Sequence, residues 1–203
     1  HKNELWFDTN DLDKIKNKLF LSRDKFWNEI NHTINWKPTI SGYTTSLNLI
    51  ENEYPWRECI ESMLGFCNEV VIVDGGSTDD TYNQLKLWEK KEKKLKVYQK
   101  IRDWSHPRFA MFDGEQKSFA RSHCTGNLCW QQDADEVIHE ESFEKIMYLA
   151  KNFPDSYDVI SLPIIEYWGS INKVRMDINP WKWRLSKNKE NIIHGIPKRL
   201  RKY

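Results

Sequence analysis

The chain has 203 residues, a length that fits one domain or one domain with a short appendage. Its 31 Lys and Arg residues nearly balance 30 Asp and Glu residues, so it lacks the strong basic excess typical of general nucleic-acid binding. Ten Trp, nine Phe and eight Tyr residues supply large apolar groups for a core, which excludes a disordered chain. No stretch predicts a membrane span, and no signal-peptide pattern opens the sequence.

Residues 1–37 predict an N-terminal helical extension that packs on a domain formed by residues 38–203. Apolar side chains recur in this extension at roughly helical spacing. They are Leu12, Ile15, Leu19, Phe26, Trp27 and Ile30.

The first part of the domain predicts strands that alternate with helices. Residues 39–49 indicate a strand and its exit loop, and a helix follows from Pro55 to about Phe66. Residues 69–74 form a short apolar run that ends in an aspartate, typical of a strand buried on both faces. A helix to about Lys91 and a strand at 95–99 come next. This order predicts a parallel sheet with right-handed crossovers, whose ligands bind beyond the carboxyl ends of the strands.

Residues 113–121 predict a loop and then a short helix. Two cationic side chains of this segment, Lys117 and Arg121, are candidates for pairing with phosphates or with nearby carboxylates. The alternative is a pair of solvated helix charges.

Asp133 and Asp135 follow the apolar residues 128–130. On an extended backbone, residues i and i+2 point to the same side, so both carboxylates could address one ligand. Two like charges that close raise each other's pKa unless a cation neutralises them. Hard oxygen ligands at a strand end suit Mg²⁺ or Mn²⁺ carrying a phosphate. The alternative is an acidic first turn of a helix, favoured by the helix dipole.

The remaining sequence predicts one helix and two strands. The helix covers residues 142–151, and the strands cover 159–167 and 181–186. Pro163 indicates an edge strand or a bulge. The cysteines lack zinc-like pairing, so we expect buried free thiols in a reducing compartment. They are Cys59, Cys67, Cys124 and Cys129.

Three motifs in this order resemble the family 2 glycosyltransferases of GT-A fold. They are the run Val73-Asp74-Gly75-Gly76-Ser77-Thr78-Asp79-Asp80-Thr81, the pair Ala120-Arg121, and Asp133-Ala134-Asp135-Glu136. The resemblance covers about residues 38–150. It implies an α/β fold of GT-A (Rossmann-like) type, with a mostly parallel central sheet flanked by helices. It also implies a nucleotide-binding half at 38–136, an acceptor-side half at 137–203, and inverting, metal-dependent sugar transfer.

The resemblance also implies roles for single residues. A UDP- or GDP-sugar would bind across the strand ends. Asp135 would ligate Mn²⁺ or Mg²⁺ with Asp133 as its partner, Asp74 would lie near the nucleobase, and Thr44 or Thr45 near the nucleoside. Many members carry a second aspartate at the position of Gly75, and this aspartate often contacts the uracil. The resemblance therefore does not say which nucleobase the donor carries. His194 stands where relatives bring a third metal ligand or a phosphate contact.

An inverting enzyme needs a carboxylate that takes the acceptor proton. The candidates are Glu166, Asp177 and Glu136, and Glu166 is preferred because it ends a strand. The acceptor would be a glycan or glycolipid at the cytoplasmic side, with peripheral membrane contact allowed. Two other classes stay open: a nucleotidyltransferase of similar architecture, whose basic phosphate loop is not seen at residues 41–45, and a non-catalytic carbohydrate-binding domain.

Overall fold

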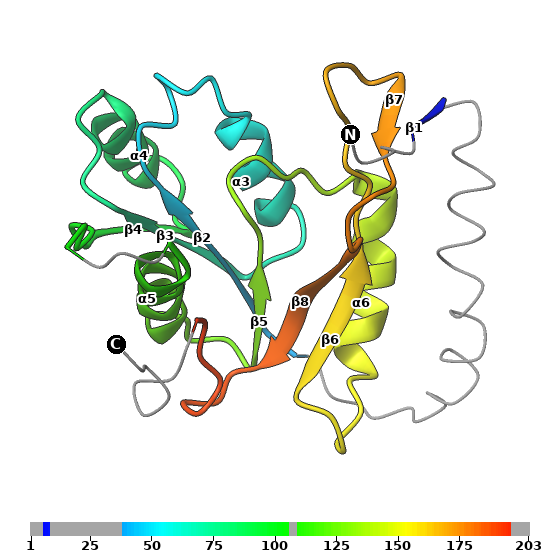
Figure 1. Cartoon of the computed structure of the whole chain (residues 1–203). Coiled ribbons are helices and arrows are strands. Elements are labelled where there is room, and N and C mark those ends of the chain that lie inside the picture. The colour runs from blue at the N-terminus through cyan, green and yellow to red at the C-terminus, as the bar shows by residue number, and fades with distance from the viewer. Residues whose placement is uncertain (1–5, 9–37, 106–108, 196–203) are drawn as a thin grey trace. The chain divides into compact units, whose positions relative to one another are not determined.

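The computed structural model describes residues 6–8, 38–105 and 109–195, and it divides into two compact units (Figure 1). The described residues of the large unit are 38–105, 109–151 and 185–195. Those of the small unit are 6–8 and 152–184.

A six-stranded sheet has the strand order β4-β3-β2-β5-β8-β6. Its strands are β2 (Ile40–Ser46), β3 (Glu69–Asp74), β4 (Leu95–Gln99), β5 (Leu128–Gln131), β6 (Val159–Pro163) and β8 (Trp181–Lys187). β2, β3, β4 and β5 pair in parallel, whereas β8 runs antiparallel to β5. This confirms the predicted α/β class with a mostly parallel central sheet. β6 ends at Pro163 and lies at the edge of the sheet, because proline cannot donate to a further strand.

Helices follow the strands and cover both faces of the sheet. They are α3 (Trp56–Leu64), α4 (Thr81–Glu89), α5 (Phe109–Ser122) and α6 (Phe143–Lys151), with a 3₁₀ turn at Glu140–Ser142. Successive residues of a strand face opposite sides. Gly42 accordingly faces Met63 of α3, whereas Tyr43 packs with Ala120 of α5. None of the described helices is both long and apolar enough to cross a membrane.

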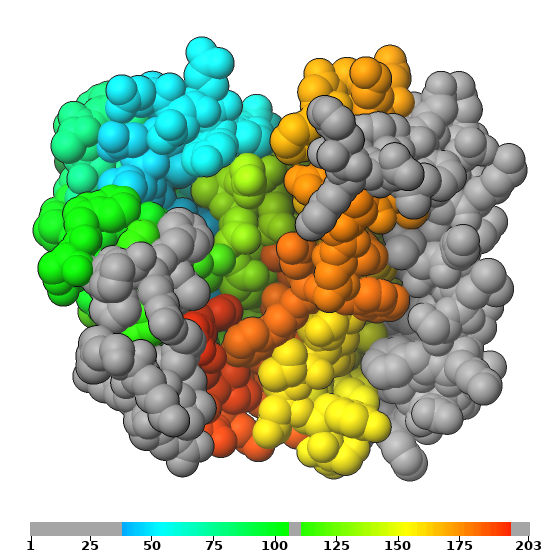
Figure 2. All heavy atoms as spheres, in the orientation of Figure 1, coloured from blue at the N-terminus to red at the C-terminus, as the bar shows by residue number. Residues whose placement is uncertain are grey.

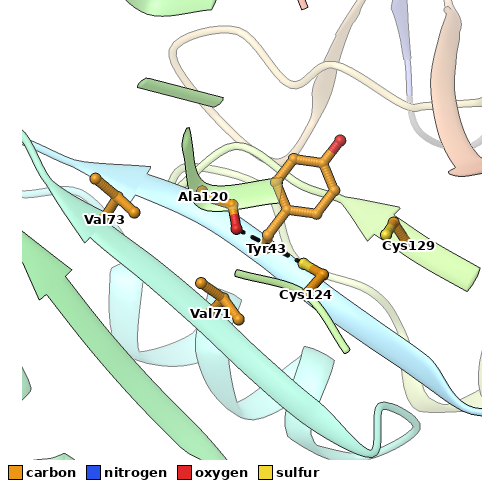
Figure 3. Close-up of a cluster of buried hydrophobic side chains, with 6 residues drawn as sticks. All are labelled: Tyr43, Val71, Val73, Ala120, Cys124 and Cys129. Carbon is orange, nitrogen blue, oxygen red and sulfur yellow. Dashed lines mark hydrogen bonds between the residues drawn. The ribbon is translucent and has the colours of Figure 1, made fainter. Parts of the chain in front are cut away.

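The core between the sheet and α5 combines Tyr43 with small and β-branched side chains. In Figure 3, Tyr43, Val71 and Val73 project from the strands toward Ala120 and Cys124. All residues of β3 from 70 to 73 have no exposed surface, and full burial of one such side chain contributes about 1.5–3 kcal/mol. The continuous apolar run in the sequence is therefore explained by burial on both faces. All four cysteines are free and buried, as predicted.

α5 corrects the prediction of a loop and a short helix at 113–121. It spans 14 residues, and Gly114 lies within it. A Cβ at position 114 would come within 2.7 Å of the Gly195 Cα. Glycine is therefore present because another backbone packs closely against the helix, and it marks no turn.

In the small unit, β1 (Trp6–Asp8) pairs antiparallel with β7 (Lys173–Arg175). β1 is the only part of the predicted N-terminal extension among the described residues, and it is a strand. The helices predicted from Leu12 to Ile30 lie outside the described residues.

Candidate functional site

The carboxyl ends of β2, β3 and β5 meet at one edge of the sheet. Ser46 lies opposite Asp74 in the parallel register, and Tyr43 lies opposite Gln131. The segments that follow these strands therefore leave the sheet together. In Figure 2 the yellow-green atoms that follow β5 reach the surface beside cyan atoms that follow β2. This edge is the usual ligand site of a parallel sheet.

Residues 133–136 form a turn at this edge, which we call the acidic turn. The Glu136 amide donates to the Asp133 carbonyl at 3.0 Å, and the Asp133 amide donates to Glu136 Oε2 at 2.8 Å. Our premise of an extended backbone through Asp133 and Asp135 is therefore wrong. The side chain of Glu136, a candidate base, is used to close the turn.

Gln132 anchors the acidic turn and was not singled out from the sequence. It is fully buried, and its Nε2 donates to the Glu136 carbonyl at 2.7 Å and to Ser62 Oγ at 3.2 Å. Its Oε1 accepts from Trp130 Nε1 at 3.0 Å. A buried amide with several partners rigidifies its surroundings. The position of the acidic turn is thus fixed from β5 and from α3.

The two aspartates of the acidic turn differ in environment. Asp135 is exposed, and desolvation followed by the neighbouring Asp133 carboxylate raises its pKa. Asp133 is half-buried, and its Oδ1 accepts from Lys117 Nζ at 2.7 Å and from Gln131 Nε2 at 2.8 Å. One carboxylate is therefore compensated by the protein itself, and the other faces solvent without an ion pair among the described residues.

Lys117 pairs with two carboxylates. Pairing with nearby carboxylates was one of the two alternatives predicted from the sequence. Its Nζ lies 2.7 Å from Asp133 and 3.2 Å from Asp113, one helical turn earlier on α5. Burial acts to lower its pKa, but the two carboxylates outweigh burial and hold the pKa above its ordinary value. Lys117 is therefore charged at neutral pH and fixed beside the acidic turn.

His194 contacts the Tyr43 hydroxyl through its Nε2 at 2.5 Å. Burial, and then the positive charges of Lys117 and Arg121, lower the pKa of His194 to about 4, so the ring is neutral at neutral pH. Burial raises the pKa of Tyr43, which keeps its proton. The Nε2 atom of the neutral His194 ring is therefore already engaged by the Tyr43 hydroxyl.

Arg121 is buried, with 4% of its surface exposed. Its Nε donates to the Ile192 carbonyl at 3.1 Å, and its terminal nitrogens donate to Ser186 Oγ at 2.8 Å and the Lys187 carbonyl at 2.5 Å. Ser118, on the same helix, accepts from the His194 amide at 2.9 Å. These bonds fasten residues 186–194 to α5, so Arg121 is no solvated helix charge.

Asp74 has no exposed surface and is surrounded by donors. Its Oδ1 accepts from the hydroxyls of Ser46 at 3.0 Å and Ser77 at 2.5 Å. Its Oδ2 accepts from the amides of Gly76 and Ser77, both at 2.9 Å, and from Gln99 Nε2 at 3.2 Å. The carboxylate therefore shapes the loop that follows β3.

At Gly75, where many family members carry a second aspartate, the side chain of Arg102 packs against the backbone. A Cβ on Gly75 would lie 2.8 Å from Arg102 Nε and 3.0 Å from Arg102 Cγ. The Arg102 amide also donates to the Gly75 carbonyl at 2.9 Å. The space beside this strand end is thus filled by an arginine side chain.

The two threonines at the end of β2 face opposite sides of the sheet. Thr44 is 2% exposed, and its Oγ1 has no partner among the described residues. Thr45 is half-buried, and its side chain is the more accessible of the two.

Glu166 and Asp177, the other candidate bases, lie together in the small unit. Glu166 does not end a strand as predicted, because β6 ends at Pro163. Arg175 contacts Glu166 through NH1 at 3.2 Å and Asp177 through Nε at 2.9 Å. Both carboxylates are thereby oriented by one guanidinium.

The donor set of the acidic turn fits a divalent ion that arrives with a phosphate group. No cluster of three His, Cys, Asp or Glu side chains that could hold a metal occurs within residues 6–8, 38–105 and 109–195. Mg²⁺ is usually bound by one or two carboxylates together with substrate phosphates. Asp135 and the neighbouring Asp133 supply two carboxylates.

The sequence matches the family described as "Glycosyl transferase family 2" over residues 52–198, well over half of the chain. The chain belongs to this family. Membership confirms the resemblance and agrees with the observed fold. The search of curated proteins finds no match.

Similarity to solved structures is partial. S. aureus TarS 1-349 in complex with UDP is 24% identical, covers 55% of this chain and 31% of that chain, and has a TM-score of 0.43. S. aureus TarS 1-349 is 20% identical, covers 74% and 47%, and has a TM-score of 0.48. The mannosyltransferase PcManGT from Pyrobaculum calidifontis, in complex with GDP-Man and Mn²⁺, is 18% identical, covers 75% and 44%, and has a TM-score of 0.46. The chain spans about a third to a half of the length of these structures.

Proposed function

We propose that this family 2 chain transfers a sugar, with inversion, from a nucleoside diphosphate sugar to a hydroxyl of a glycan or glycolipid. The observation that carries the proposal is the acidic turn at the carboxyl edge of a parallel sheet. There, an exposed Asp135 lies beside an Asp133 that is paired with a half-buried lysine. A site with both carboxylates and a fixed cation suits a diphosphate and a divalent ion.

Departure of the sugar builds negative charge on the leaving diphosphate. Bound Mn²⁺ or Mg²⁺ would stabilise that charge, and Asp135 with Asp133 would hold the ion. Lys117 supplies a second, preorganised positive charge beside Asp133. His194, whose Nε2 is already engaged by the Tyr43 hydroxyl, fits the phosphate contact better than the metal-ligand role.

The nucleoside would lie across the strand ends. Asp74 acts there by shaping the loop after β3, because its oxygens already accept hydrogen bonds from the protein. Thr45 is the better candidate for a direct contact, since Thr44 is buried. Arg121 supports the site by holding residues 186–192 and makes no direct contact with the donor.

The acceptor hydroxyl must lose its proton as the new bond forms. Glu166 is our first choice as the base and Asp177 the second, because the carboxylate of Glu136 already accepts from the Asp133 amide and closes the acidic turn. Arg175 orients both side chains. Glu166→Gln should lower kcat with little change in donor affinity, whereas Glu136→Gln should disturb donor affinity through the turn.

Nucleotide release from a panel of UDP- and GDP-sugars tests the proposal. The full chain is assayed with Mn²⁺, with EDTA, and with and without saccharide acceptors. We expect release from at least one donor in Mn²⁺ that is lost in Asp135→Asn and in EDTA. Asp80→Asn is the matched control, because the carboxylate of Asp80 accepts from Asn83 and Gln84 on α4 and lies outside the acidic turn.

Two results contradict the proposal. Saccharide binding without any nucleotide affinity would indicate a carbohydrate-binding domain. Release that survives both EDTA and Asp135→Asn would place the chemistry away from the acidic turn.

A further inference from the structure

Lys117 occupies a position at the acidic turn that a divalent ion would also need. Its ammonium group contacts Asp133 Oδ1 at 2.7 Å, and Gln131 Nε2 donates to the same oxygen at 2.8 Å. The side chain of Lys117 is 17% exposed and that of Asp133 is 46% exposed, so the lysine end of the pair is the one shielded from solvent. Charges attract and repel more strongly there than in bulk water.

A second carboxylate gives Lys117 another place to pair. Asp113 precedes it by one turn of α5 and contacts the same ammonium at 3.2 Å. If the contact with Asp133 were broken, the lysine would keep a negative partner and would not become an isolated buried charge. Asp113 is 19% exposed and belongs to the same rigid helix, so this second partner stays in place.

We propose that Lys117 competes with the divalent ion for Asp133, and that metal binding moves the lysine fully onto Asp113. The inference rests on the proposed function, since it assigns the metal to the acidic turn. Lys117 is thus a residue that sets metal affinity: it weakens binding of the metal alone. Once released from Asp133, its charge is available to the diphosphate that accompanies the ion. Metal and donor diphosphate should therefore bind better together than either does alone.

Binding of Mn²⁺ alone, measured by electron paramagnetic resonance of the free ion at neutral pH, tests the proposal without turnover. Lys117→Met should bind Mn²⁺ about tenfold more tightly than the wild type, a change equal to about 1.4 kcal/mol. Lys86→Met is the matched control, because Lys86 forms its ion pair with Glu89 on α4 and should leave the affinity unchanged.

A double-mutant cycle separates competition from simple charge repulsion. In an Asp133→Asn background the contested carboxylate is gone, so Lys117→Met should change the Mn²⁺ affinity by less than about twofold. A tenfold gain that persists in this background would mean general repulsion and would overturn the proposal. Unchanged or weaker Mn²⁺ binding in Lys117→Met would also overturn it.

Asp113→Asn gives a second test, in which Lys117 loses its other partner. Without Asp113 the lysine depends on Asp133 alone, so Mn²⁺ should bind about threefold more weakly, and Lys117→Met should abolish that loss. If Asp113 had only a structural role, the weaker Mn²⁺ binding of Asp113→Asn would persist when Lys117→Met is added. Absence of Mn²⁺ binding in the wild type and in every variant would refute the metal in the proposed function itself. Binding that depends on Asp135 but ignores Lys117 would refute only this inference.

Discussion

Replacement of Arg121 by Met tests whether this arginine supports the fold or binds the donor. The guanidinium donates to two backbone carbonyls and to Ser186 Oγ, and only 4% of the residue is exposed. Methionine fills a similar volume but donates nothing. The three acceptors would lose their donor without gaining ready access to water.

The expected loss follows from these contacts. A buried acceptor left without its partner costs about 1–3 kcal/mol, and taking the low end for three partly shielded acceptors gives about 3 kcal/mol. For a chain of 150–250 residues, 1 kcal/mol corresponds to a shift in Tm of roughly 2–4 °C, so Arg121→Met should melt about 6–12 °C lower. Arg121→Lys keeps the charge and part of the bonding, and should show an intermediate loss.

Thermal unfolding followed by circular dichroism measures the effect, and titration with UDP and GDP on the folded variant measures donor affinity. We expect a large loss of stability and a change in nucleotide affinity of less than about threefold at a temperature where the variant is folded. A variant that melts with the wild type but no longer binds nucleotide would refute the supporting role.

Two further predictions concern the segment that Arg121 holds. Because folding lowers the pKa of His194 to about 4, the unfolded state binds more protons between pH 6.5 and 4. Wild-type stability should therefore fall as the pH drops through this window, by up to about 3 kcal/mol, and urea unfolding of His194→Gln should show a smaller fall. In Gly114→Ala the new Cβ would meet the Gly195 backbone at 2.7 Å, so we expect a loss of about 1–3 kcal/mol in the same assay. Equal pH slopes for His194→Gln and wild type, or an unchanged midpoint for Gly114→Ala, would count against these contacts.

The sheet could be predicted from the sequence where burial leaves a continuous apolar run. Residues 69–74 are predicted and observed as one strand, because burial on both faces requires apolar side chains throughout. The start of α5 could not be predicted in this way. Gly114 reads as a turn residue when it is considered locally, and the reason for it is the backbone of Gly195, 81 positions later.

The candidate site shows the same division between local and long-range information. The acidic pair could be placed at a strand end from the sequence, because parallel strands end at one edge. The conformation of the acidic turn, which carries Asp135, could not be predicted. It depends on the buried Gln132, whose side chain bonds Ser62 far away in the sequence. The partner of His194 is equally distant, because Tyr43 lies 151 positions earlier. Hydrogen bonds over such separations leave no periodic pattern in the sequence.

We propose that the acidic turn holds a divalent ion together with a nucleoside diphosphate. Calorimetric titration of UDP and GDP into the full chain, with and without Mn²⁺, tests it most directly. We predict that Mn²⁺ tightens the binding of one nucleotide by at least about tenfold in the wild type and in Asp80→Asn, and that Asp135→Asn loses this gain. Equal nucleotide affinity with and without Mn²⁺, or a gain that survives in Asp135→Asn, would contradict the claim.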